Sequence, residues 1–113
     1  MPQKEPLAVH KVDLKGNTWF SITFRPDALP QLARALASAG RSVNGYGIEA
    51  FAVHVAENGS PAWAEDLEFD SQNDLFCVRC SRPAPLRFLV RRLQKRLDKP
   101  SALRRDVRAS AEP

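Results

Sequence analysis

The chain has 113 residues, of which 43% are hydrophobic and 27% charged, so it can bury one core without disulfide or metal staples. No apolar run approaches the ~20 residues of a membrane-spanning helix, and two cysteines are too few for a disulfide scaffold. The net charge of +4 is unevenly spread. Residues 42–78 hold seven acidic side chains and no lysine or arginine, whereas residues 79–113 hold eleven basic and three acidic ones. The start of the chain shows no secretory signal pattern, so we expect a cytoplasmic protein without a membrane partner.

The N-terminal part of the chain predicts a short tail and a β-hairpin. Residues 1–6 are expected to be flexible. Residues 8–14 alternate between apolar and polar side chains, and residues 19–24 are rich in aromatic and β-branched types, which favours two strands. The Lys-Gly-Asn sequence at 15–17 is a turn signal, so the strands should pair.

Two helices are predicted next. Pro26 ends the second strand, and Asp27 is expected to cap a helix whose apolar residues recur at helical spacing over 29–36. Gly40 suits the end of that helix. A second apolar stripe of the same period predicts a helix over 48–57.

The C-terminal half repeats the pattern of hairpin and helix. The Asn-Gly-Ser-Pro sequence at 58–61 is a break, and residues 67–70 and 74–80 are predicted to form a second hairpin. Five apolar positions on one face predict a helix over 83–98. Ser101 is expected to cap a short last helix, which frays into a flexible tail at 110–113.

Together these elements predict a single α+β domain over residues 7–109. Its four-stranded antiparallel sheet comes from two hairpins with helices packed on one face, in the order ββααββαα. A shift of 57 residues places Arg25-Pro26 on Arg82-Pro83 and aligns the leucines that follow. This match indicates either an internal ββαα duplication or chance agreement between two units of the same kind.

The chain offers few groups for catalysis or metal binding. His10 and His54 belong to no metal-ligand or hydrolase pattern. Cys77 and Cys80 lie in a predicted strand, where residues three apart point to opposite faces, so Cys77 is interpreted as a small core residue rather than a redox thiol. An enzyme would need a histidine to meet Asp70 or a cysteine in a pocket. We therefore expect no catalytic residue, no metal site, no cofactor and no enzymatic activity.

The acidic segment supports two interpretations. Asp66, Glu68 and Asp70 alternate with Leu67 and Phe69, which is typical of a strand with one solvated and one buried face. The same carboxylates could form an acidic docking surface for a basic protein.

The helix at 83–98 carries charge of the opposite sign. Arg87, Arg91 and Lys95 are spaced by one turn each and form a basic stripe beside the leucines. Such a stripe can bind nucleic-acid phosphates, which makes a nucleic-acid-binding module the alternative function. Phe88 is the only nearby aromatic candidate for base stacking, so nucleic acid is the less favoured partner.

Residues 44–81 resemble the immunity protein 51 family of bacterial polymorphic toxin systems. The matching stretches are Asn44-Gly45-Tyr46-Gly47-Ile48-Glu49-Ala50 and Leu67-Glu68-Phe69-Asp70-Ser71-Gln72-Asn73-Asp74-Leu75-Phe76-Cys77. The sequence departs from the family pattern at Ile48, where tryptophan is expected, and at Asp74, where glycine is common in the turn. The resemblance implies a non-enzymatic inhibitor that binds a cognate toxin in the cytoplasm of the cell that makes both.

The residues expected to contact that toxin are Tyr46, Glu49, Glu65, Asp66, Glu68, Asp70 and Asp74. Two of them have structural alternatives, because Tyr46 could pack against the sheet and Glu49 could simply favour the first turn of its helix. An exposed edge strand leaves the choice between monomer and homodimer open.

Overall fold

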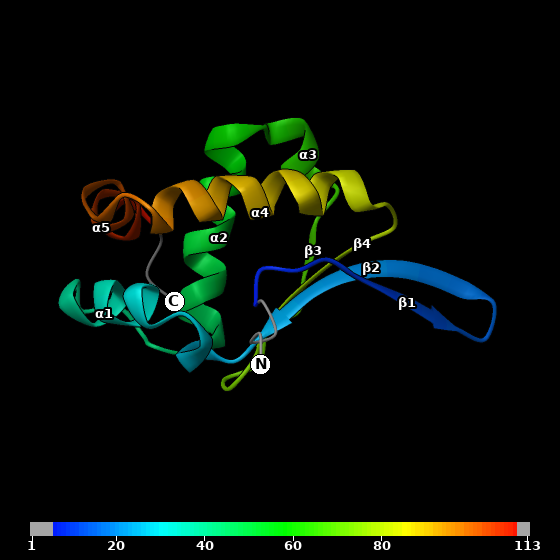
Figure 1. Ribbon diagram of the computed structural model, residues 1–113, viewed down its shortest axis with the longest axis horizontal. Coiled ribbons are helices and arrows are strands. Elements are labelled where there is room, and N and C mark those ends of the chain that lie inside the picture. Colours follow the sequence, from blue (N-terminus) through cyan, green and yellow to red (C-terminus); the bar gives the residue numbers. More distant parts are fainter. Residues whose placement is uncertain (1–5, 111–113) are drawn as a thin grey trace.

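The computed structural model describes residues 6–110 of the chain (Figure 1). The strands are β1 (His10–Leu14), β2 (Asn17–Phe24), β3 (Glu68–Phe69) and β4 (Phe76–Cys80). The α-helices are α1 (Pro30–Ser38), α2 (Gly45–Gly59), α3 (Pro61–Glu65), α4 (Pro83–Leu97) and α5 (Pro100–Ala109), and the 3-10 turn η1 (Pro26–Ala28) precedes α1.

The four strands form one antiparallel sheet in the order β1-β2-β4-β3, which confirms the predicted α+β fold. The central pair joins the two hairpins, with Ile22 opposite Val78 and Phe24 opposite Phe76. All four side chains are buried, and the Phe24 and Phe76 rings lie 4.9 Å apart. The helices pack on the face that these residues share, while the tip of the β1–β2 hairpin extends away from them (Figure 1).

Strand register decides which cysteine belongs to the core. Cys80 lies opposite Phe20 on the helix-covered face and is 3% exposed. Cys77 lies opposite Thr23 on the other face and is only half-buried. The expectation that Cys77 is the core residue was therefore wrong, although the two cysteines do point to opposite faces as predicted.

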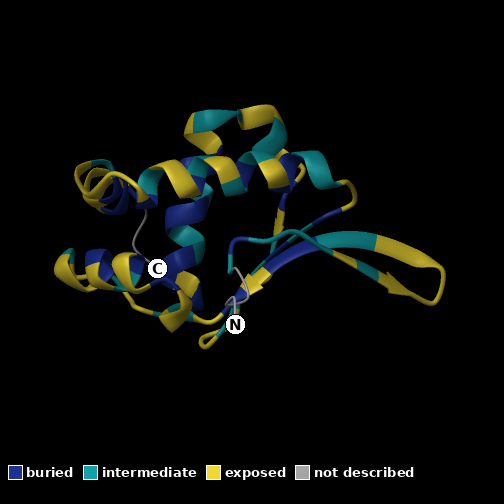
Figure 2. Ribbon diagram, in the orientation of Figure 1, coloured by how far each residue is buried: buried dark blue, intermediate teal, exposed yellow. Residues whose placement is uncertain are grey.

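The helical layer is built around α2. Ile48, Phe51 and Val55 are each 1% exposed, and α2 contacts α3, α4, α5 and β4. The predicted leucine face of α4 is buried over the sheet (Figure 2). Full burial of one such aliphatic side chain stabilises the fold by roughly 1.5–3 kcal/mol, so this face accounts for much of the attachment of α4.

A buried ion cluster ties three helices together at the end of this layer. Asp106 of α5 is 8% exposed and pairs with the guanidinium of Arg96 on α4. The same carboxylate lies 3.7 Å from Nε2 of His54 on α2 and 3.6 Å from Nε of Arg105. A carboxylate this deeply buried requires such partners, because burying it alone is strongly unfavourable.

Several helix starts differ from the predictions. Asp27 does not cap α1, because the chain first forms η1 and the helix begins at Pro30. Ser101 does not cap α5 either, since Pro100 already occupies the first turn. Proline has no N–H to satisfy there, so it starts a helix where a capping side chain was expected.

The second hairpin and the break before it also differ in detail. The expected break continues into α3, whose first turn is capped where Ser60 Oγ accepts a hydrogen bond from Trp63 N at 3.4 Å. The first strand of the second hairpin is short, covering Glu68–Phe69 rather than 67–70. The predicted tails lie mostly outside the described residues, at 1–5 and 111–113. Ser110, predicted within the C-terminal tail, is buried, and its hydroxyl donates to the Val107 carbonyl at 2.6 Å.

The duplication stays a prediction, and the strand register qualifies it. A 57-residue shift would align Ile22 with Arg79, which points to the opposite face of the sheet. A 56-residue shift aligns Ile22 with Val78, its partner at the centre of the sheet. The central strands β2 and β4 therefore correspond at a shift of 56, whereas the leucines of the two helices align at a shift of 57.

Candidate functional site

The N-terminus of α2 is docked on the loop 70–75 between β3 and β4. Gly45 N donates to the Asn73 carbonyl at 2.9 Å, and Asn44 Nδ2 donates to Asn73 Oδ1 at 3.2 Å. Asn44 also caps the helix, because its Oδ1 accepts from Gly47 N at 2.8 Å. A Cβ on Gly45 would lie 1.9 Å from the Gln72 carbonyl oxygen, so only glycine permits this approach.

Glu49 strengthens the same junction. Its carboxylate accepts a hydrogen bond from Ser71 N at 3.3 Å, and Ser71 Oγ in turn accepts one from Cys77 N at 3.1 Å. Burial raises the pKa of the Cys77 thiol; Arg79 opposes this effect, while Asp70 and Glu49 add to it. The side chains of Glu49, Asp70 and Cys77 therefore share one local electrostatic environment at this junction.

Tyr46 lies on the outer side of α2 and does not pack against the sheet. Its side chain is 47% exposed, and Val43 just before the helix is 45% exposed. An open groove of about 590 Å³ runs along the helix from Tyr46 and is lined by Tyr46, Glu49, Ala50, Val53, His54, Glu57 and Ala109. We call Val43, Tyr46, Glu49, Val53 and Glu57 the α2 face.

Three of the acidic residues predicted to contact a partner are paired with two arginines. Arg79 lies 4.0 Å from the carboxylate of Glu68 and 3.7 Å from that of Asp70. Arg82 pairs with Asp66 at 2.5 Å. These pairs lower the net negative charge along β3, so the strand edge is less acidic than its sequence indicates.

The predicted contact residues consequently separate into two groups. Tyr46, Glu49, Asp70 and Asp74 gather where α2 meets the loop, whereas Glu65, Asp66 and Glu68 lie at the end of α3 and on β3. Glu65 and Asp74 are exposed and make no ion pair within residues 6–110.

Sequence reasoning missed Val43, Val53 and Glu57. Tyr46, Val53 and Glu57 recur at turn-like spacing on α2, opposite the stripe that fills the core. An amphipathic analysis that counted the outer stripe as well as the inner one would have identified this face.

The basic helix offers a different surface. Arg87, Arg91 and Lys95 are exposed and make no ion pair in the described part of the chain. Phe88 is not available for base stacking, because its ring packs edge-on against Trp63 at 5.1 Å and Arg92 lies 6.0 Å from its centre. The nucleic-acid alternative thus loses its one aromatic candidate for base stacking and rests on the basic stripe alone.

Residues 6–110 contain no group of three histidine, cysteine or acidic side chains placed to hold a metal ion. None of the helices in this part of the chain is long and apolar enough to cross a membrane.

A scan against protein-family models finds no match, and neither the curated proteins nor the solved structures yield one. The resemblance to the immunity protein 51 family therefore rests on the two stretches quoted above. The structure brings these stretches into contact through Gly45, Glu49 and the 70–75 loop.

Proposed function

We propose that the protein is an immunity protein that binds and neutralises a cognate bacterial toxin through the α2 face and the adjoining 70–75 loop. The observation that carries the proposal is an exposed aromatic, Tyr46, in a groove along α2 that also holds the exposed carboxylate of Glu57, with the exposed Val43 just before the helix. An aromatic anchor surrounded by charged residues is the usual composition of a protein-binding hot spot.

The junction supplies the rigidity that such binding needs. Gly45, Asn44 and Glu49 all hydrogen bond to the loop, so the docking residues are held in place before the toxin arrives. A preorganised surface loses less conformational freedom on binding, which favours high affinity.

The exposed acidic residues indicate what kind of surface the proposed partner has. Glu57 and Glu65, which line one groove at the end of α2, and Asp74 of the loop are exposed, and their charges would steer a toxin with a basic surface and speed its capture. Inhibition in this scheme needs no chemistry, cofactor or metal from the immunity protein, because burying the toxin surface is sufficient. The complex would form in the cytoplasm.

The first experiment is co-expression with the neighbouring upstream open reading frame. We expect the neighbour alone to arrest growth, and this protein to restore growth and to co-purify with it. A neighbour that is harmless, or that this protein neither binds nor relieves, contradicts the proposal.

A variant pair then tests the surface itself. Tyr46→Ala combined with Glu57→Lys should weaken toxin affinity by about 30-fold or more, since each removes an exposed contact without touching the core. The matched control is Leu14→Ala combined with Asp27→Lys, which makes the same kinds of change at exposed positions elsewhere. Equal affinity of both variants, measured by calorimetry, would place the interface on another surface.

A further inference from the structure

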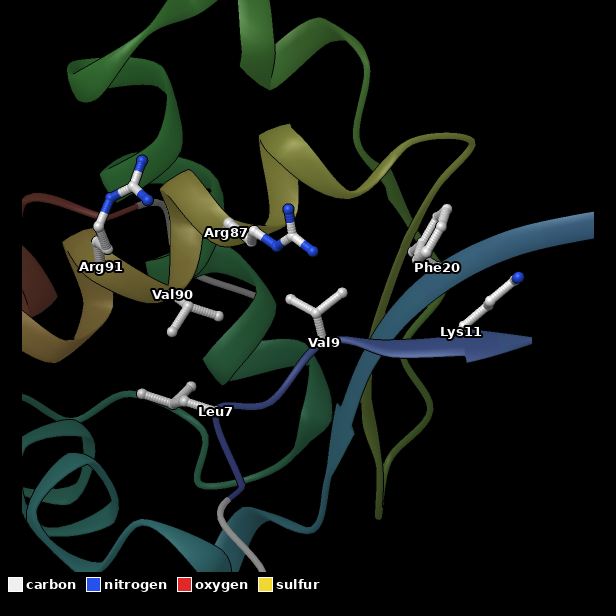
Figure 3. Close-up of a pocket in the computed structure, with 7 residues that line it drawn as sticks. All are labelled: Leu7, Val9, Lys11, Phe20, Arg87, Val90 and Arg91. Atoms are coloured by element: carbon white, nitrogen blue, oxygen red, sulfur yellow. The ribbon is translucent and has the colours of Figure 1, made fainter.

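A second groove lies between the N-terminal segment and α4 (Figure 3). It measures about 510 Å³, its floor is formed by Leu7, Val9, Phe20 and Val90, and its rim carries Lys11, Arg87 and Arg91. The proposed toxin-docking function uses none of these residues.

The groove exists because α4 covers only part of the sheet. The helix packs on β2 and β4, and beside it Val9 and Phe20 are half-buried and Lys11 is exposed, whereas Leu7 is buried. Leu7, Val9 and Lys11 alternate along this segment and line the same groove, as side chains two residues apart in an extended chain should.

The positive charge on the rim is not compensated. Lys11, Arg87 and Arg91 make no ion pair within residues 6–110, in contrast to Arg79, Arg82 and Arg96. Asp13 is the acidic residue closest to Lys11 along β1, and its carboxylate accepts a hydrogen bond from the Thr18 hydroxyl at 2.5 Å. A ligand that supplies carboxylates would therefore meet free cations over an apolar floor.

β1 also offers backbone groups. It is the first strand in the order β1-β2-β4-β3, so one of its edges has no strand partner among residues 6–110. On every second residue of an edge strand, the N–H and C=O groups point away from the sheet and can pair with another extended chain.

We propose that this groove binds an extended acidic peptide segment of a partner protein, which pairs with β1 as an added strand. Alternate residues of such a strand share one face, so its acidic residues face the arginines of the rim and the residues between them face away from the groove. Main-chain pairing would give affinity and the groove would give specificity, as in other cases of strand addition. Arg87 and Arg91 are one turn apart, about 6 Å along the helix, and alternate residues of a strand are about 6.6 Å apart. Two successive acidic side chains can thus reach one arginine each.

Nucleic acid fits the same groove less well. Its floor is largely aliphatic, from Leu7, Val9 and Val90, whereas bases need exposed aromatic faces and phosphates gain nothing from an apolar surface. Phe20 is the one aromatic side chain lining the groove, and it is half-buried against the core.

The test is fluorescence polarisation of the full chain with a labelled, end-blocked peptide of alternating glutamate and valine, long enough to span β1. We expect saturable binding that weakens with salt, and none to the matched lysine–valine peptide. Methylation of alternate peptide nitrogens should abolish binding, because it removes the donors that strand pairing requires. Tighter binding of an oligothymidine probe than of the peptide, self-association of the protein through β1, or undiminished binding of the methylated peptide would each overturn the proposal.

A pair of double variants checks the rim. Arg87→Ala with Arg91→Ala should weaken peptide binding at least about tenfold. Arg104→Ala with Arg108→Ala removes the same charge from exposed positions one turn apart on α5, outside the groove, and should change it by no more than about twofold. Circular dichroism verifies that both variants are folded, and equal losses in both would show that the groove makes no specific contribution.

Discussion

The acidic edge along β3 and the basic groove beside α4 look equivalent in sequence, as two runs of like charge. In the structure they differ, because Arg79 and Arg82 pair with three carboxylates in and beside β3 and offset most of their charge, while Arg87 and Arg91 have no acidic partner among the described residues. Pairing across the fold, rather than the count of charges along the chain, decides which charges remain available to a ligand. For this reason we propose the α2 face, rather than the acidic strand β3, as the centre of the docking site.

The largest expected effect breaks the junction on which the acidic side depends. Gly45→Ala places a methyl group against the carbonyls of Gln72 and Leu75, so α2 and the loop must separate. We expect a loss of about 3 kcal/mol in the free energy of unfolding, measured by urea denaturation. Tyr46→Ala, in the same helical turn but exposed, is the control and should change stability by less than about 0.5 kcal/mol. A Gly45→Ala protein of normal stability would show that the 70–75 loop can shift to accommodate the methyl group at little cost in free energy.

A second change contrasts paired and unpaired arginines on one helix. Asp106→Asn leaves the largely buried Arg96 without its counter-charge, and we expect it to cost about 2–3 kcal/mol. Arg91→Ala removes an exposed arginine with no ion pair in the described part of the chain, and should cost less than about 0.5 kcal/mol. Thermal unfolding measures both. Similar losses for the two variants would mean that the ion cluster contributes little beyond an exposed charge.

A smaller effect is expected from the exposed pair of Asp66 and Arg82. A double-mutant cycle with Asp66→Asn and Arg82→Ala should give a coupling energy of about 0.2–1 kcal/mol, because solvent screens side chains that are 43% and 55% exposed. The coupling should shrink further in high salt. A coupling energy well above this range would show that the Asp66–Arg82 pair is held rigidly and is little screened by solvent.

The smallest effect concerns pH. Because burial raises the pKa of Cys77 above its ordinary value of 9.0, folding favours the neutral thiol. Its contribution to stability is complete below the unfolded pKa, and it is lost as the pH rises from about 9 through the higher folded pKa. Cys77→Ala should flatten the fall in stability over that alkaline range, as measured by urea titration at several pH values. An unchanged slope would assign the fall to other groups.

The sequence predicted the element types better than their ends. Apolar periodicity located α1, α2 and α4, and alternation located the hairpins, since both patterns report which face is buried. The starts of α1 and α5 were misassigned because Pro30 and Pro100 begin these helices, while the capping rules pointed to Asp27 and Ser101.

Only part of the candidate site could be predicted from the sequence. Tyr46, Glu49, Asp70 and Asp74 were identified and do lie at one junction. The pairing of Glu68 and Asp70 with Arg79 depends on strand register, which the sequence does not determine by itself. The groove beside β1 depends on how far α4 reaches across the sheet, a tertiary property without a local signal.

The Ile22–Val78 pair has a kinetic consequence. Each hairpin closes a loop of only a few residues. The β2–β4 pairing instead joins strands from different halves of the chain. The entropy cost of closing that long loop must be met before the contacts between the strands can offset it. We expect Val78→Ala to slow refolding in stopped-flow measurements far more than Val12→Ala, and equal effects would argue against this order of events. In this order of events the two hairpins form quickly, and the pairing of β2 with β4 limits the folding rate.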